Sequence, residues 1–109
     1  MNIKRYRKCD YFALRVTEDL GIRSDLSALK DAVVEYLEKG ITRIAVSFTP
    51  HSFLNSEAVA VCVQCVEMVR DKGGTLGIIR PNAQILDILK ITGLEDLVQV
   101  FDSEEELQG

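Results

Sequence analysis

The residues of this sequence that could do chemistry are few and widely spaced. The single histidine, His51, follows an apolar run that ends near Phe48. No second histidine is available for a metal site, and no triad partners are evident. We therefore expect His51 to be a loop residue that can contribute to a binding surface, and we predict no catalytic residue and no metal site.

Cys62 and Cys65 form a C-x-x-C pair, a spacing used both in redox exchange and in zinc binding. A redox pair needs a helix N-terminus to lower the thiol pKa, but this pair falls well inside a predicted helix. A zinc site needs four ligands, and only Cys9 and His51 remain to complete one. We interpret the pair as small apolar residues near the core.

Phosphate-binding and cofactor-binding motifs are also missing from the sequence. No G-x-G-x-x-G follows a strand and no Walker lysine loop occurs, while Gly73 and Gly74 are explained as a helix end. We expect no cofactor and no enzymatic activity. The alternative of a small enzyme using His51 and a cysteine has no substrate that the sequence suggests.

The net charge and the composition exclude further classes of protein. Over 109 residues, 47% are apolar and 28% charged, which is typical of a soluble globular domain, and the net charge of −4 argues against a nucleic-acid partner. No run approaches the ~18 apolar residues of a membrane helix, and neither a signal peptide nor a disulfide framework is indicated. We expect a cytoplasmic protein with reduced thiols and no membrane span.

Hydrophobic periodicity predicts alternating strands and helices. Strands are expected at 11–16, 41–48, 75–80 and 97–101, and helices at 26–39, 57–71 and 82–92. Ser24 or Asp25 is the expected cap of the first helix. Ser103 and Glu106 form a capping-box pattern for a last helix that is very short or truncated. The basic start of the chain is interpreted as a solvated terminus or the edge of a first strand.

This alternation predicts an α/β fold with a largely parallel sheet, in one domain spanning 1–109. Five segments carry a family resemblance: GITRIAVSF at 40–48, FLNSEA at 53–58, KGGTL at 72–76, ITGL at 91–94 and FDSEEE at 101–106. In this order they resemble the STAS domain over 11–107. That family includes anti-sigma-factor antagonists, stressosome subunits and domains attached to anion transporters. The resemblance implies a mixed, mostly parallel sheet flanked by helices.

The resemblance also implies a regulatory switch in the segment 53–58. The family pattern is Phe-Met/Leu-Asp-Ser-Ser/Thr-Gly, in which a partner kinase, also the anti-sigma factor, phosphorylates the second hydroxyl residue. The unphosphorylated antagonist binds that kinase and frees the sigma factor. Transferred to this sequence, Phe53 and Leu54 match, Asn55 stands for the aspartate, Ser56 keeps the first serine, Glu57 replaces the phosphoacceptor and Ala58 replaces the glycine.

Glu57 therefore brings a permanent negative charge to the position where a phosphoserine would carry about −1.5 to −2. Asn55 removes a neighbouring acidic group and its repulsion. Both residues are also what an ordinary helix start prefers, since Asn is a good N-cap and Glu suits the first turn. Ser56 is the remaining candidate for phosphorylation.

The resemblance implies that an anti-sigma-type serine kinase or a stressosome-like assembly is the partner, with residues 55–58 and His51 at the contact. The alternative is a module that binds a small molecule or a lipid, for example in a transport system. The N-terminal strand is a candidate for pairing between two chains, which would give a homodimer.

Overall fold

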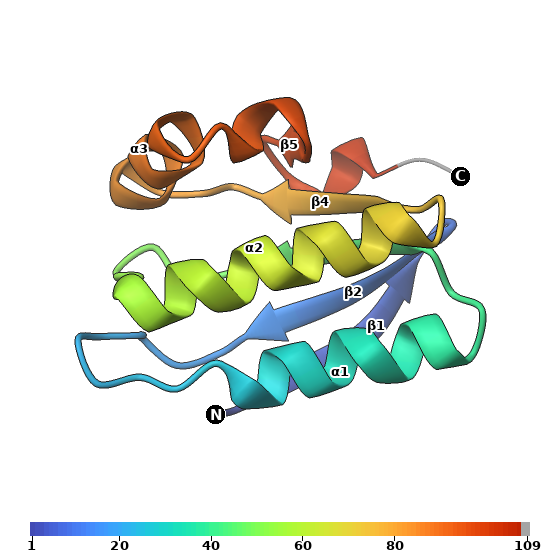
Figure 1. The fold of residues 1–109 in the computed structure, drawn as a ribbon, viewed down its shortest axis with the longest axis horizontal. Coiled ribbons are helices and arrows are strands. Elements are labelled where there is room, and N and C mark those ends of the chain that lie inside the picture. The colour runs from blue at the N-terminus through green and yellow to red at the C-terminus, as the bar shows by residue number, and fades with distance from the viewer. Residues whose placement is uncertain (108–109) are drawn as a thin grey trace.

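The structure is a computed structural model that describes residues 1–107. Figure 1 shows strands and helices that alternate after an initial pair of strands. The strands are β1 (Ile3–Lys8), β2 (Tyr11–Val16), β3 (Arg43–Ser47), β4 (Thr75–Ile79) and β5 (Gln99–Phe101). The helices are α1 (Ser27–Glu38), α2 (Ser56–Asp71) and α3 (Ala83–Ile91), with short 3-10 turns η1 (Leu94–Asp96) and η2 (Glu104–Glu106).

Strand β1 is the element that the sequence left undecided between a solvated terminus and a strand edge. It forms an antiparallel hairpin with β2, in a register that runs from Ile3 opposite Val16 to Lys8 opposite Tyr11. Its six residues include four basic ones, so no apolar alternation marks it as a strand. Basic residues are common on edge strands because they discourage further pairing. The hairpin turns at Cys9, which has a φ of 55°.

The four strands β2 to β5 are parallel and lie in chain order, which makes the sheet mixed and mostly parallel. Right-handed crossovers between successive neighbours place the connecting helices on one face. Figure 1 shows α1 and α2 side by side in front of the sheet, with α3 beside β4. The main core fills this layer with fully buried side chains such as Leu14, Ile44 and Val66.

The opposite face of the sheet is covered by the end of the chain. Residues 102–107, which we call the C-terminal strap, turn back after β5 and place Leu107 against Tyr11, Ala45 and Ile79 with only 1% of Leu107 exposed. The predicted last helix is therefore the very short alternative, the turn η2. Ser103 lies at its N-cap position but makes no side-chain capping hydrogen bond.

Two of the three helices begin at an asparagine that caps them. Asn55 caps α2 and Asn82 caps α3, each through its side-chain oxygen. The expectation that Ser24 or Asp25 caps α1 is wrong, because Leu26 holds the N-cap position without a side-chain bond. Asp25 instead accepts hydrogen bonds from the backbone N–H and the hydroxyl of Ser27, which lower the pKa of its carboxyl.

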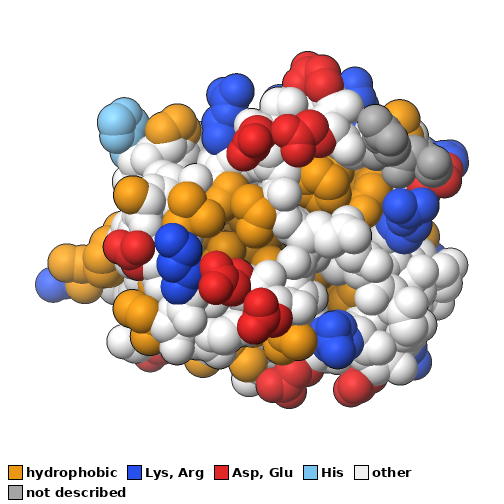
Figure 2. Space-filling view, turned by 90° about the horizontal axis from the view of Figure 1, so that it is seen from above, with side chains coloured by type: hydrophobic (Ala, Val, Ile, Leu, Met, Phe, Trp, Pro, Cys, Tyr) orange, Lys and Arg blue, Asp and Glu red, His pale blue; other side chains and the backbone are white. Residues whose placement is uncertain are grey.

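The surface seen from above α3 and β5 mixes apolar and charged side chains. Figure 2 shows apolar side chains gathered near the middle of this view, with acidic and basic groups around them. Exposed large apolar residues of this part of the chain are Ile91, Leu97 and Val100. Among residues 1–107, no helix is long and apolar enough to cross a membrane.

Candidate functional site

The predicted switch segment lies where the β3–α2 connection enters helix α2. Phe53 is 44% exposed, and Ser56 and Glu57, the first two residues of α2, are also exposed. Leu54 and Ala58 point inward and are 4% and 1% exposed. The segment therefore presents one aromatic, one hydroxyl and one carboxylate side chain to solvent, while its two aliphatic side chains fix it to the core.

Asn55 connects this helix start to a second loop. Its side-chain oxygen accepts a 2.7 Å hydrogen bond from the backbone N–H of Ala58, which caps α2. Its amide nitrogen donates to the backbone carbonyls of Gly21, Ile22 and Ser24 in the β2–α1 loop, at 3.4, 2.7 and 3.1 Å. The two loops are thus held together by one side chain that uses both of its polar atoms.

Two further amide side chains hold residues 49–55, which we call the switch loop. Asn82 caps α3 and donates from its amide to the carbonyls of Pro50 and Ser52, at 3.0 and 2.8 Å. Gln84 exchanges two hydrogen bonds with the backbone of Leu54. Since loops are normally the mobile part of a fold, these bonds pre-organise a surface that would otherwise be flexible.

Ser52 joins the switch loop to the β2–α1 loop from beneath. Its side chain is 2% exposed, and its hydroxyl accepts a 3.0 Å hydrogen bond from the backbone N–H of Leu20. The Ser52 and Thr49 hydroxyls lie 2.6 Å apart and share one further bond. The backbone N–H of Phe53 also donates to the carbonyl of Leu20, at 2.8 Å. The two loops therefore form one connected platform.

The structure brings the predicted residues 55–58 into one helical turn and leaves His51 on the adjoining loop. His51 is exposed and projects from the surface as the pale blue side chain of Figure 2. Within residues 1–107 its imidazole takes part in no hydrogen bond or ion pair that would mark it as a catalytic group.

Sequence reasoning missed some of the residues that build this surface. Ser52, Asn82 and Gln84 hold it in place, yet only Asn82 carried a signal, as the start of a helix. Ile22, 80% exposed on the β2–α1 loop, adds an apolar side chain beside the loop segment that Asn55 binds. An isoleucine within the polar stretch 17–25 was the available signal for it.

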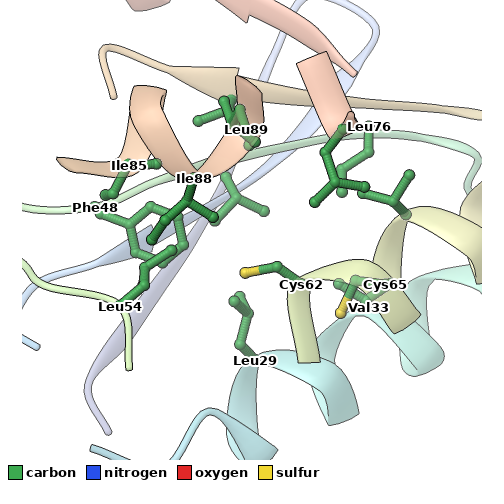
Figure 3. Close-up of a pocket in the computed structure, with 14 residues that line it drawn as sticks. Leu29, Val33, Phe48, Leu54, Cys62, Cys65, Leu76, Ile85, Ile88 and Leu89 are labelled. Carbon is green, nitrogen blue, oxygen red and sulfur yellow. The ribbon is translucent and has the colours of Figure 1, made fainter. Parts of the chain in front are cut away.

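The C-x-x-C pair lies inside α2, facing the core as predicted. Figure 3 shows the Cys62 sulfur pointing into a cavity bordered by Leu29, Leu54 and Ile88, and Cys65 lines the same cavity. Burial raises the pKa of Cys62 to about 12 and that of Cys65 to about 11, so both stay neutral thiols. Within the described chain no three metal-ligating side chains come together.

The apolar cavity next to Cys62 is small. Its volume is about 30 Å³, far below the roughly 300–1,000 Å³ of small-molecule pockets. Its walls are aliphatic, aromatic and thiol side chains from all three helices and the sheet. As it stands, the cavity has no room for a lipid chain.

Comparison with known proteins identifies the family. The model of the STAS domain family matches residues 6–107, and the chain belongs to this family. A candidate anti-sigma factor antagonist of Thermotoga neapolitana is 29% identical over 104 residues, which is 92% of each chain. A candidate anti-sigma factor antagonist of Thermotoga maritima is 24% identical over 94 residues, covering 86% of this chain and 83% of its own.

Solved structures share the fold. The crystal structure of a candidate anti-sigma factor antagonist from Thermotoga maritima has a TM-score of 0.81 at 23% identity, covering 95% of this chain and 89% of that one. The phosphorylated form of the Bacillus cell fate determinant SpoIIAA has a TM-score of 0.69 at 11% identity, covering 95% of each chain. The predicted α/β fold and the STAS resemblance are confirmed.

Proposed function

We propose that this protein is a non-enzymatic regulator of the anti-sigma-factor-antagonist type. It binds an anti-sigma-type serine kinase or a stressosome-like assembly in the cytoplasm, through the platform of the two loops and the first turn of α2 that follows it. The observation that carries the proposal is the platform itself. It presents Phe53, Ser56 and Glu57 to solvent on a backbone held by three side-chain amides.

The carboxylate of Glu57 is suited to contact a partner protein rather than to stabilise its own fold. None of the ion pairs among residues 1–107 includes it, so its charge is free to meet a cation of another protein. We propose that Glu57 supplies permanently the negative charge that phosphorylation supplies in relatives of the usual pattern. The contact would then be independent of phosphorylation at position 57.

The contacts of Asn55 and Glu57 support different roles for the two residues. Asn55 is explained by folding alone, because it caps α2 and binds three carbonyls of the neighbouring loop. Glu57 has only the favourable helix dipole to explain it, which is worth about 0.3–1 kcal/mol. Partner binding is therefore assigned to Glu57 and Ser56, and the positioning of the backbone to Asn55.

Incubation with an anti-sigma-type kinase from the same organism, followed by mass spectrometry, tests the loss of the phosphorylation switch. The wild-type protein should stay unmodified, whereas Glu57→Ser should gain one phosphate on residue 57. Glu67→Ser, a matched exposed glutamate on the same helix, should stay unmodified as well. Phosphate on Ser56 of the wild type would sink the idea and restore an ordinary switch.

A further inference from the structure

A crevice opens at the carboxyl ends of the parallel strands, on the side of the sheet away from the helices. Its volume is about 640 Å³, and it lies between the ends of β2, β3 and β4 and the C-terminal strap. Small-molecule sites typically have volumes of roughly 300–1,000 Å³. This crevice has the size of such a site and lies at the carboxyl ends of three parallel strands.

Arg80, on one wall of the crevice, holds an unusual backbone conformation. It follows β4 directly and has a φ of 48°, in the left-handed region that favours glycine and asparagine. Its backbone N–H donates a 2.7 Å bond to the carbonyl of Phe101, which ties the turn to the end of β5. A large side chain at a strained position points to a use for that side chain.

Two basic and two acidic side chains line the crevice, Arg15 and Arg80 with Glu104 and Glu105, and Glu105 lies near Arg80. Arg15 is paired with Glu104 of the strap at 2.6 Å, and Glu104 also accepts a 3.3 Å bond from the hydroxyl of Tyr6. Arg80 donates from Nε to the carbonyl of Asp102, at 3.3 Å, and forms no ion pair within residues 1–107. A guanidinium is the side chain best suited to bind a carboxylate or a phosphate.

Hydroxyl groups face the same space. Ser47 and Thr49 come from the end of β3 and the loop after it, and Ser103 comes from the strap. Ile79 and Pro81 add apolar surface beside them. The lining thus offers the Arg80 guanidinium, with the Glu105 carboxylate near it, several groups that donate or accept hydrogen bonds, and apolar surface. It suits a small molecule with an anionic group that competes with Glu105 for Arg80.

The crevice also adjoins the supports of the switch loop. Thr49, Pro50 and Asn82 line it, and the same Asn82 holds the carbonyls of Pro50 and Ser52. A molecule seated in the crevice would therefore touch the residues that position the platform from behind.

We propose that this crevice is a binding site for a small molecule bearing a carboxylate or a phosphate, with Arg80 as its principal anion-binding side chain. Occupation of the site changes the position of the switch loop through Asn82 and thereby the affinity of the platform for its partner. This second step rests on the proposed function, whereas the binding itself does not.

Titration of the full-length, isotope-labelled protein with inorganic phosphate and, separately, with malonate tests binding by amide chemical shifts. Saturable shifts at Thr49, Arg80 and Ser103 are expected, and the stronger of the two probes identifies the anionic group. Shifts that never saturate, or that saturate elsewhere on the surface, would overturn the proposal.

Arg80→Asn is the decisive variant, because asparagine tolerates the left-handed backbone and the fold should be kept or stabilised. Its affinity for the stronger probe should fall at least about tenfold, the loss of one charge-assisted contact. Lys39→Asn, which removes an exposed cation after α1, should bind like the wild type. Equal affinity in Arg80→Asn would contradict the assignment.

Coupling is measured separately, by titrating the kinase partner with and without a saturating amount of the stronger probe. A changed affinity in the wild type that is absent in Arg80→Asn supports coupling. An unchanged affinity refutes coupling while leaving the anion site intact. Saturable anion binding by a protein that binds no kinase would refute the proposed function and leave the site standing.

Discussion

Asn55 is the residue on which the geometry of the platform depends most. One polar atom of its side chain caps α2, and the other binds three backbone carbonyls of the β2–α1 loop. An aspartate, the residue of the usual family pattern, could make the cap but has no hydrogen to donate. In this chain the asparagine is therefore required by the contact between the two loops.

Asn55→Asp tests this double role. The variant keeps an acceptor for the N–H of Ala58 but sets a carboxylate against carbonyl oxygens, so we expect a loss of about 1–3 kcal/mol in the free energy of unfolding. Urea denaturation measures the loss. Asn2→Asp, a change at an exposed residue, serves as the control and should unfold like the wild type. Equal stability of Asn55→Asp would show that the loop contact contributes little.

The cysteines give a second prediction at this scale. Because the thiolate is the reactive form, the raised pKa values of Cys62 and Cys65 should keep both unreactive at neutral pH in the folded protein. A thiol reagent should modify exposed Cys9 quickly and the other two only after unfolding. The Cys9→Ser variant should then show no fast reaction. Fast modification of Cys62 in the folded protein would contradict its placement on the core side of α2.

At the scale of elements, the strands and helices with a clear apolar period were predictable. The helix at 57–71 and the strand at 75–80 differ from α2 and β4 by only one residue at one end. Strand β1 and the strap could not be predicted from the sequence, because neither carries a periodic apolar pattern. β1 is defined by pairing with β2, and the strap by Leu107 packing on Tyr11, a contact between the two ends of the chain.

The candidate site was predictable to a similar degree. The switch segment could be located from its resemblance to a family pattern, and its place at a helix start from Asn55. Its supports could not be found in this way, because Ser52 and Gln84 act through backbone groups of loops that are distant in sequence. The crevice was missed because its walls come from three strand ends and the strap.

Gly77→Ala tests how closely β5 and the strap pack on the rest of the sheet. A Cβ at Gly77 would lie 2.6 Å from the ring of Phe101, whereas a Cβ at Gly21 would meet nothing within 4 Å. Displacing the ring should also disturb its edge contact with Tyr11. We expect Gly77→Ala to lose about 1–3 kcal/mol of stability and Gly21→Ala to lose none, in thermal or urea unfolding. A stable Gly77→Ala would mean that the ring moves aside freely.

The whole molecule exposes β1 as one edge of its sheet, and a homodimer through that edge was one expectation. The structure gives a physical argument against it. Four of the six residues are basic, and pairing two such strands would set like charges against one another. The hydrogen-bonding edge of β1 should therefore stay unpaired in solution.

Amide exchange of residues 3–8 at low and at high protein concentration checks this expectation. The exchange rates should be the same at both concentrations. Added salt screens the repulsion between the basic side chains, so a high-salt sample gives the most favourable condition for pairing. Slower exchange at high concentration in β1 alone would establish the dimer that the charges disfavour. This readout is specific to β1 and is unaffected by association through another face.

The central claim is that a partner recognises the exposed start of α2 through the charge of Glu57. Calorimetric titration of an anti-sigma-type kinase from the same organism against Glu57→Lys tests it most directly, with Glu67→Lys on the same helix as control. The account predicts wild-type affinity for Glu67→Lys and a loss of at least about tenfold for Glu57→Lys, or about 1.4 kcal/mol. Equal affinities of the two variants would contradict it.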